Sequence, residues 1–303
     1  MVLAILRSMV ALKQCNLSFN PLVQPWQTNC HVEPFLKLTD LALNNTNIQW
    51  DALMNLLKAC PNLQELHLSL NDFSMKPEPQ SGDDDSTSSQ PCFDSVRILA
   101  IDQCCMTHWE RVTAVCRYFP NLQGLIASGN EVAEFGSSES IKRQFRMLES
   151  LNVNHWRIND WDSLNVFRVF PSLRSLRLKS IPLFENLDDK QRIRLAIACL
   201  PSIVVLNGTN VEDDRREDSE RYFIRHFLDV PAKPERYYEL VAIHGHLQPL
   251  LDIDLSPKLT ADVMVVYEDT NKKELVEVTA LGYFSSDLYH LLTEQGPKTG
   301  YRA

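Results

Sequence analysis

Glycine is scarce in this sequence, with 9 among 303 residues, and neither GxGxxG nor GxxxxGKS/T occurs. The glycine-rich loops that cradle phosphates are therefore missing, which argues against nucleotide binding. The net charge is −9, and the sequence contains no block of about five basic residues. Binding driven by phosphate neutralisation, as in nucleic-acid proteins, is therefore not expected, and the expected partner is a protein.

Long apolar runs and paired cysteines are missing too. No stretch of about eighteen uncharged apolar residues exists, so we expect no transmembrane helix. The 8 cysteines show no Cys-x-x-Cys spacing, which favours buried free thiols in a reducing cytosol over a zinc or redox site. The apolar start, residues 1–10, carries its charge (Arg7) inside the apolar run, so we expect internal protein and not a signal peptide.

What the sequence does contain is a repeat. Windows of the form LxxLxLxxNxI recur in register, beginning at Leu12, Leu38, Leu63, Val96, Leu122, Leu148, Leu173 and Ile203. The steps between these residues are 26, 25, 33, 26, 26, 25 and 30. A period of roughly 20–29 residues with this leucine pattern is typical of leucine-rich repeats, in which each unit contributes one short strand and a turn.

Helical spacing of apolar residues follows several of the expected strands. The segments are 50–60, 109–119, 161–170 and 190–200, and a proline follows each one, two residues before the next unit. Since proline ends a helix and favours an extended chain before it, the next strand begins there. Trp50, Trp109 and Trp161 open three of these helices, and their shared register favours core packing over a peptide-binding stack. The sequence thus predicts an α/β leucine-rich-repeat solenoid over residues 1–210.

Four segments depart from the repeat. The acidic Ser/Pro-rich insertion 75–91 is expected to be a mobile loop on the convex side, either a solvated insertion or a contact segment. Residues 211–230 predict a capping helix over the open end of the array, because Phe223 and Phe227 lie on one apolar stripe. Residues 231–258 are expected to be a linker. Residues 259–303 predict strands at 261–267 and 274–278 and a helix at 286–294, too little for an independent core.

The residues that flank the strand leucines are expected to face the concave surface of the solenoid. The early strands place Asp40 and Glu65 there, so charge changes along the surface from acidic to basic, with an apolar centre. The candidate partner-binding residues are Ile98, Ile126, Asn152, Asn154, Arg174, Arg177 and Lys179. The basic end fits an acidic protein by complementary charge. The same residues are equally compatible with an ordinary solvated face.

The end of the array resembles one family. The stretches LPSIVVLNGTNV, REDSERYFIRHFLDVP and PERYYELVAIHGHLQPL are similar to the end of the repeats in the tubulin-specific chaperone cofactor E family. Residues 261–294 are similar to the start of that family's ubiquitin-like domain. The resemblance is specific over 207–250 and generic through the repeats. No glycine-rich cytoskeleton-associated segment precedes the repeats here, so the cofactor E-like (leucine-rich-repeat) members are the closer match.

The resemblance implies a function in tubulin biology. It implies a non-catalytic, cytoplasmic and cytoskeletal protein that binds tubulin, as the alpha subunit or the heterodimer, and regulates its folding, dissociation or destabilisation. It also implies an incomplete ubiquitin-like (β-grasp) tail. The alternative is a leucine-rich-repeat scaffold or adaptor, including one whose tail links a client to the ubiquitin–proteasome pathway.

Residue clusters that would carry other chemistry are incomplete. Cys104 and Cys105 with His108 lack further ligands, and His244 with His246 in an expected surface loop lacks a third. The acidic run 83–85 lacks the alternating spacing and final glutamate of a calcium loop. We therefore expect no catalytic residues, no metal site and no cofactor, and no enzymatic activity.

Overall fold

The structure is a computed structural model that describes residues 11–22, 34–73, 91–249, 260–266 and 273–279. The chain divides into two compact units, Met1–Pro249 and Leu250–Ala303. The predictions made for residues 1–10, 75–90 and 286–294 lie outside the described residues. In the described part, no helix has both the length and the apolar composition that crossing a membrane requires.

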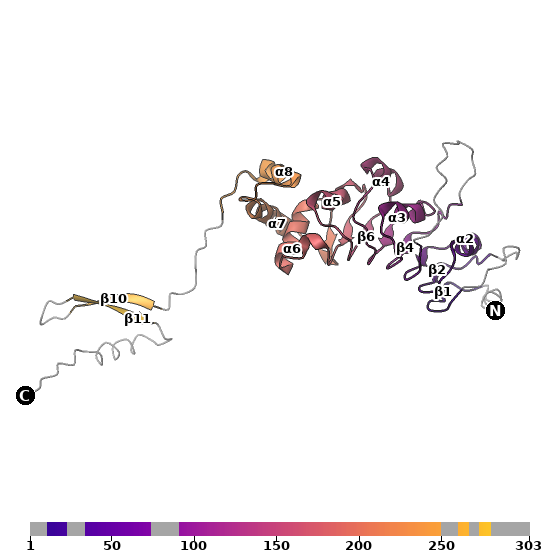
Figure 1. Ribbon diagram of the computed structural model, residues 1–303, viewed down its shortest axis with the longest axis horizontal. Helices are drawn as coiled ribbons and strands as arrows, with labels where there is room; N and C mark the ends of the chain where they lie inside the picture. Colours follow the sequence, from indigo (N-terminus) through magenta and orange to yellow (C-terminus); the bar gives the residue numbers. More distant parts are fainter. Residues whose placement is uncertain (1–10, 23–33, 74–90, 250–259, 267–272, 280–303) are drawn as a thin grey trace, which may run out of the picture. The chain divides into compact units, whose positions relative to one another are not determined.

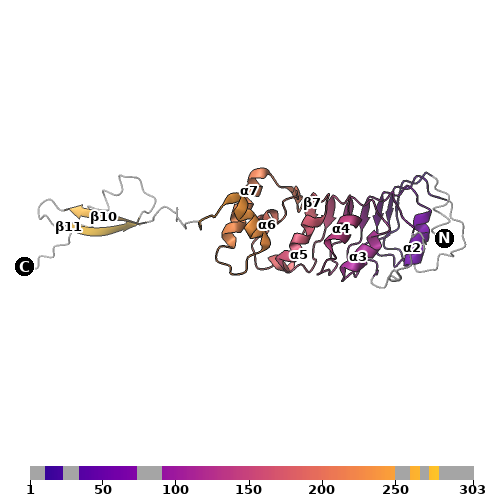
Figure 2. The ribbon, with the colours of Figure 1, turned by 90° about the horizontal axis from the view of Figure 1, so that it is seen from above.

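Nine strands of the described residues form one sheet in chain order. They are β1 (Gln14–Asn16), β2 (Asp40–Ala42), β3 (Glu65–His67), β4 (Ile98–Ala100), β5 (Gly124–Ile126), β6 (Ser150–Asn152), β7 (Ser175–Arg177), β8 (Val205–Leu206) and β9 (Thr209–Asn210). From β1 to β8 the strands pair in parallel, and from β2 onward they place leucines opposite one another, as with Leu41, Leu66 and Leu99. Figure 2 shows these strands as successive rungs of one ladder, and the predicted leucine-rich-repeat solenoid is confirmed.

Helices α2 to α5 lie along one side of this ladder (Figure 1). The helices are α2 (Trp50–Lys58), α3 (Trp109–Cys116), α4 (Ser138–Gln144), α5 (Trp161–Asn165), η1 (Val166–Val169), η2 (Pro182–Phe184), α6 (Asp189–Cys199), α7 (Asp213–His226) and α8 (Glu235–His244), where η1 and η2 are short 3-10 helices. The three tryptophans open α2, α3 and α5 as predicted, and the ring of Trp109 packs against Phe145 and Trp156 at 5.6 and 6.2 Å. The tryptophans therefore join neighbouring repeats through the core.

Side-chain donors tie four of the turns to the repeat before them. The donor and acceptor pairs are Asn71 to the Leu43 carbonyl (2.8 Å), Cys104 to Leu68 (3.3 Å), Asn130 to Ile101 (2.8 Å) and Trp156 to Ala127 (2.7 Å). Because buried carbonyl groups require a hydrogen-bond partner, Cys104 and Trp156 supply a donor where asparagine is replaced. The Cys104 thiol is thus a structural donor, with a pKa raised to about 12 by burial. Cys92 and Cys105 are exposed, contrary to the expectation that the thiols are buried.

The sheet of the first unit ends in a hairpin. Strand β9 pairs with β8 in antiparallel orientation, through a turn in which Asn207 and Gly208 have φ values of 54° and 87°. An Asn-Gly pair suits this tight turn because both of its central residues need positive φ. Beyond the hairpin, the rings of Phe223 on α7 and Phe227 just after it meet the ring of Trp161 edge-on at 5.7 and 5.3 Å. Helix α7 is therefore anchored to the last repeats by aromatic contacts.

A network of ion pairs holds α8 against the array. Arg236, only 5% exposed, contacts Glu220 on α7 at 3.2 Å and Glu239 at 2.6 Å, and Glu239 also accepts from Arg168 at 2.9 Å. Burial raises the pKa of Glu239, but hydrogen bonds and charge from Arg168 and Arg236 outweigh it, so the pKa is lowered overall. His244 pairs with Glu220 at 2.7 Å and closes α8, which corrects its expected place in a surface loop. Helix α8 falls within the predicted linker segment 231–258.

The described part of the second unit is a hairpin. Strands β10 (Thr260–Val266) and β11 (Lys273–Thr279) pair in antiparallel register from Thr260 with Thr279 to Val266 with Lys273. The predicted strands at 261–267 and 274–278 agree with this pair to within a residue or two.

Candidate functional site

The open face of the sheet, on the side away from α2 to α5, carries the predicted binding residues. Successive strand residues point to opposite sides, so residues flanking each buried middle leucine share this face. We define the open face by two rows of paired residues. One row is Asp40, Glu65, Ile98, Gly124, Ser150 and Ser175, and the other is Ala42, His67, Ala100, Ile126, Asn152 and Arg177. The second row brings Ile126, Asn152 and Arg177 side by side on three consecutive strands.

The predicted apolar centre lies on β4 and β5. Ile98 and Ile126 are both half-buried, and Ala100, which pairs with Ile126, is 3% exposed. A Cβ atom built at Gly124 would lie 3.5 Å from Ile98 Cγ1, so the isoleucine side chain covers the glycine. Two half-buried isoleucines on adjacent strands form a small apolar surface between the two charged ends.

The two predicted asparagines also have a role within the fold. Asn152 Oδ1 accepts from the Asn154 backbone N–H at 3.1 Å, and Asn154 Oδ1 accepts from the Lys179 N–H at 2.7 Å. Earlier repeats have the equivalent bond: Asn44 accepts from the Ser69 N–H, and Asp102 accepts from the Ser128 N–H. The sequence signal for this bond is a short polar side chain at the same position of these repeats. The sequence analysis did not use this signal.

The cationic end of the open face lies on and around β7. Arg174, Arg177 and Lys179 are all exposed. Arg174 donates to the Ser202 carbonyl at 3.3 Å, across to the next repeat. Within the described residues, the guanidinium of Arg177 and the ammonium of Lys179 have no hydrogen-bond or ion-pair partner. These two charges are therefore available to a ligand without breaking an existing bond.

The opposite end of the open face is acidic. Asp40 and Glu65 lie on β2 and β3, and Glu65 is 3.7 Å from His67. Asp102, just after β4, accepts from the Ser128 N–H at 2.7 Å. Burial raises the pKa of Asp102, and its hydrogen bonds and the charge of His67 offset only part of that rise. The open face therefore runs from carboxylates, through isoleucines, to free cations.

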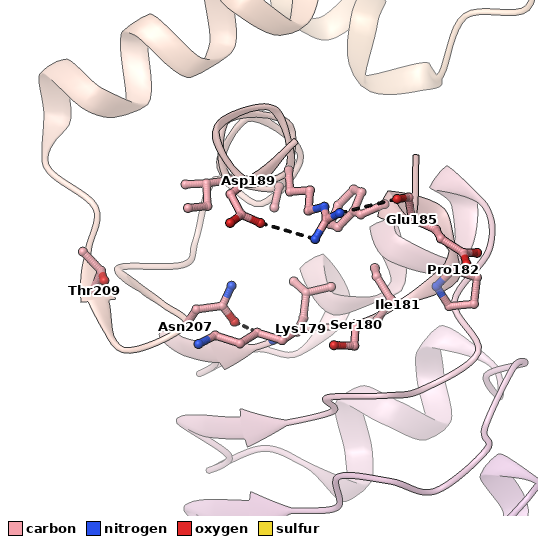
Figure 3. Close-up of a pocket in the computed structure, with 13 residues that line it drawn as sticks. Lys179, Ser180, Ile181, Pro182, Glu185, Asp189, Asn207 and Thr209 are labelled. Atoms are coloured by element: carbon pink, nitrogen blue, oxygen red, sulfur yellow. Dashed lines mark hydrogen bonds and ion pairs between the residues drawn. The ribbon is translucent and has the colours of Figure 1, made fainter. Parts of the chain in front are cut away.

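A pocket of about 730 Å³ adjoins the cationic end and was not predicted (Figure 3). Its apolar lining comes from the turn after β7, η2 and α6, and its polar lining includes Lys179 and Thr209. The apolar lining residues are Leu178, Ile181, Phe184, Ile193 and Ala196. The step of 30 residues between Leu173 and Ile203 was the available signal, because the extra length forms η2 and the loop before α6. In the described residues, no group of three or more His, Cys, Asp or Glu side chains is placed to hold a metal ion.

Comparison with known proteins gives relatives along most of the chain. Tubulin-specific chaperone cofactor E-like protein of rat is 34% identical over 257 residues, which cover 84% of this chain and 58% of the relative. The protein of the same name from Caenorhabditis elegans is 30% identical over 278 residues, 92% of this chain and 61% of the relative. The chain is homologous to the cofactor E-like proteins. The resemblance seen in the sequence is thereby confirmed.

These cofactor E-like relatives are longer than the aligned region, because the chain spans about three fifths of their length. No protein-family model matches the chain. Among solved structures, the Drosophila melanogaster SNF/U2A' complex aligns over 65% of this chain and 80% of its own, with 12% identity. Its TM-score of 0.33 is too low to support an argument about fold or function.

Proposed function

We propose that this chain is a non-catalytic tubulin-binding cofactor that regulates the tubulin heterodimer through the open face of its repeats. The observation that carries this proposal is the homology to proteins named tubulin-specific chaperone cofactor E-like protein, at 34% identity over 84% of the chain. The binding face is inferred from the chain's own residues. We also propose a location in the cytoplasm, at the cytoskeleton, which the same homology supports.

Two properties of the open face support this proposal: its charge and its extended strand surface. Repeat arrays bind partners over an extended strand surface, because side chains from successive units line up there. The free cations Arg177 and Lys179 would meet an acidic surface, and Ile98 with Ile126 would supply the dry centre of the contact. Complementary charge of this kind raises the association rate and fixes the orientation of the partner.

The mechanism we propose is differential binding. A binder shifts the equilibrium between heterodimer and separated subunits only if it binds one of these states more tightly. In this proposal the open face grips one tubulin subunit, while α7 acts as the cap that keeps the last repeats packed. The second unit, with its β10–β11 hairpin, is proposed to be part of an incomplete ubiquitin-like tail that contacts another protein. An adaptor of the ubiquitin–proteasome pathway stays the alternative.

The test is a charge reversal at the cationic end with a matched control. The triple variant R174E/R177E/K179E is mixed with tubulin heterodimer and analysed by size-exclusion chromatography and pull-down at two salt concentrations. The control, K142E/R143E/R146E, makes the same change of charge at exposed residues on and just after α4. We expect the first variant to bind about tenfold more weakly and the control to bind like the unmodified chain.

Two outcomes would count against the proposal. Equal binding by both variants would remove the cationic end of the open face from the contact. No complex between the unmodified chain and either tubulin subunit or the heterodimer would overturn the tubulin-binding function itself and favour the adaptor.

A further inference from the structure

We propose that the pocket beside β7, together with Arg177 and Lys179, binds an acidic peptide segment that inserts a bulky apolar side chain into the pocket. This inference rests on the proposed function, which names tubulin as the protein that carries the segment. The chemistry of the segment is argued from the pocket and from the charges around it. Nothing in the homology assigns such a site.

The pocket has the size and lining to hold an apolar side chain. Its volume of about 730 Å³ falls within the range of sites that bury a compact ligand. Leu178, Ile181 and Phe184 are 3%, 3% and 5% exposed, so they form a fixed apolar floor continuous with the core. A leucine or phenylalanine side chain placed there would lose its contact with water against side chains already held by packing.

The charges at the mouth are arranged to receive carboxylates on one side. Arg192 is already used, since it donates to Asp189 at 3.3 Å and to the Leu187 carbonyl at 2.6 Å. Figure 3 shows Lys179 and Asn207 on the wall that faces Asp189 and Glu185. The acidic groups of the pocket therefore lie on the α6 and η2 side, away from Lys179. Carboxylates that flank the buried side chain would lie along β7, where Lys179 has no partner in the described residues.

Arg177 extends the same site onto the open face. It is the last residue of β7 and lies two residues before Lys179, which follows the end of the strand. Its guanidinium is exposed and without a partner within the described residues. An entirely apolar segment would leave both cations unpaired, whereas a segment with acidic residues next to its anchor satisfies the pocket and both charges together. Charge complementarity thus commits the site to an acidic segment.

The test uses the full chain and three fluorescein-labelled peptides of one length, measured by fluorescence anisotropy at low and physiological salt. The first peptide is GSEEFEEGS, the second replaces Phe with Ala, and the third replaces every Glu with Gln. We expect the first peptide to bind about tenfold more tightly than either of the others, with an affinity that weakens as salt is added.

Protein variants then assign the contact to this site. T209W adds a ring at an exposed position in the pocket lining, and R177Q/K179Q removes the two free charges. We expect each to weaken binding of the first peptide about fivefold or more, and the matched variant K142Q/R143Q on α4 to leave it unchanged. R177Q/K179Q changes exposed side chains alone, so it tests the site even if T209W folds poorly.

Three results would overturn the inference. Equal affinity for all three peptides would remove both the anchor and the charge requirement. Binding of the first peptide that neither variant weakens would place the contact elsewhere. A concentration-dependent dimer that T209W abolishes would assign the pocket to a second copy of this chain.

The same variants in the tubulin pull-down separate the two proposals. Tubulin binding without peptide binding would refute this inference alone. Peptide binding without tubulin binding would refute the proposed function and leave the pocket as a site for a different acidic protein.

Discussion

At the scale of single residues, burial disfavours the charged form of the Asp102 carboxyl group. The raised pKa means that the folded protein holds this proton more tightly than the unfolded chain does. The contribution of Asp102 to stability is therefore fully present below the unfolded pKa, near 3.9, and is lost as pH rises through the folded value. At neutral pH the carboxylate lowers the free energy of unfolding.

We predict that D102N raises the free energy of unfolding at pH 7 and that this gain disappears as pH falls toward about 3, near the unfolded carboxyl pKa. Asparagine removes the charge and keeps an oxygen that accepts from the Ser128 N–H. The measurement is a urea titration at several pH values. D102A, which loses that acceptor, should destabilise the protein at every pH. A gain from D102N that does not vary with pH would contradict the burial argument.

The leucines were predictable residue by residue, and the donors of the turns were predictable only as a class. Leucine spacing identifies the buried middle residue of each strand because its period depends on backbone geometry alone. The turn donor is set by a hydrogen bond to the preceding repeat, so Asn, Cys and Trp each satisfy it with a different side chain. Cys104 and Trp156 do not match an asparagine pattern, although each donates the same hydrogen bond to the preceding repeat.

At the scale of elements, a buried aromatic side chain contributes to the contact of α7 with the last repeats. Phe223 is fully buried, and its ring meets those of Trp161 and Phe227 at 5.7 and 4.6 Å. We predict that F223A lowers the free energy of unfolding by about 3–4 kcal/mol, as for other buried phenylalanines replaced by alanine.

Urea unfolding followed by circular dichroism measures this loss. The control E217A, on the exposed side of the same helix, removes a surface pair with Arg221 and should change stability by less than about 0.5 kcal/mol. If F223A cost no more than E217A, α7 would not depend on its aromatic contacts.

Helices α4 and α8 escaped the sequence analysis for different reasons. Helix α4 buries only Ile141, so it has no apolar period, and its start is set by Ser137, which accepts from the Ser140 N–H. Helix α8 begins after Pro234, and besides Tyr237 and Leu240 it is held by charged side chains that a hydrophobic pattern does not register. Elements fixed by caps and ion pairs are poorly predicted by apolar spacing, because the spacing describes burial alone.

At the scale of the whole first unit, stability should be distributed along the array. Each repeat packs mainly on its neighbours, so a defect in one repeat acts locally. We predict that L66A, which removes a fully buried side chain on β3, accelerates amide hydrogen exchange in β2, β3 and β4 and leaves β7 nearly as protected as before. L176A on β7 should give the reverse pattern. Equal acceleration throughout the sheet by both variants would show that the array opens as one cooperative unit.

The candidate site was predictable as a face and not as a pocket. Strand alternation alone places Ile126, Asn152 and Arg177 in one row, and the pairing register agrees with that placement. The pocket depends on how η2 and the start of α6 pack after β7, and side-chain packing between non-repeating segments leaves no periodic trace in a sequence. Whether the face binds tubulin stays a prediction for the experiments above.

The antiparallel strand β9 limits how this array can have changed in length. Parallel units can be added or removed wherever a strand has a free edge, because each new rung repeats the same bonds. Val205 and Leu206 already pair with Asn210 and Thr209, so a duplicated unit inserted directly after β8 would find that edge occupied. Gene duplication can therefore lengthen the ladder upstream of β8, while the hairpin stays its last element.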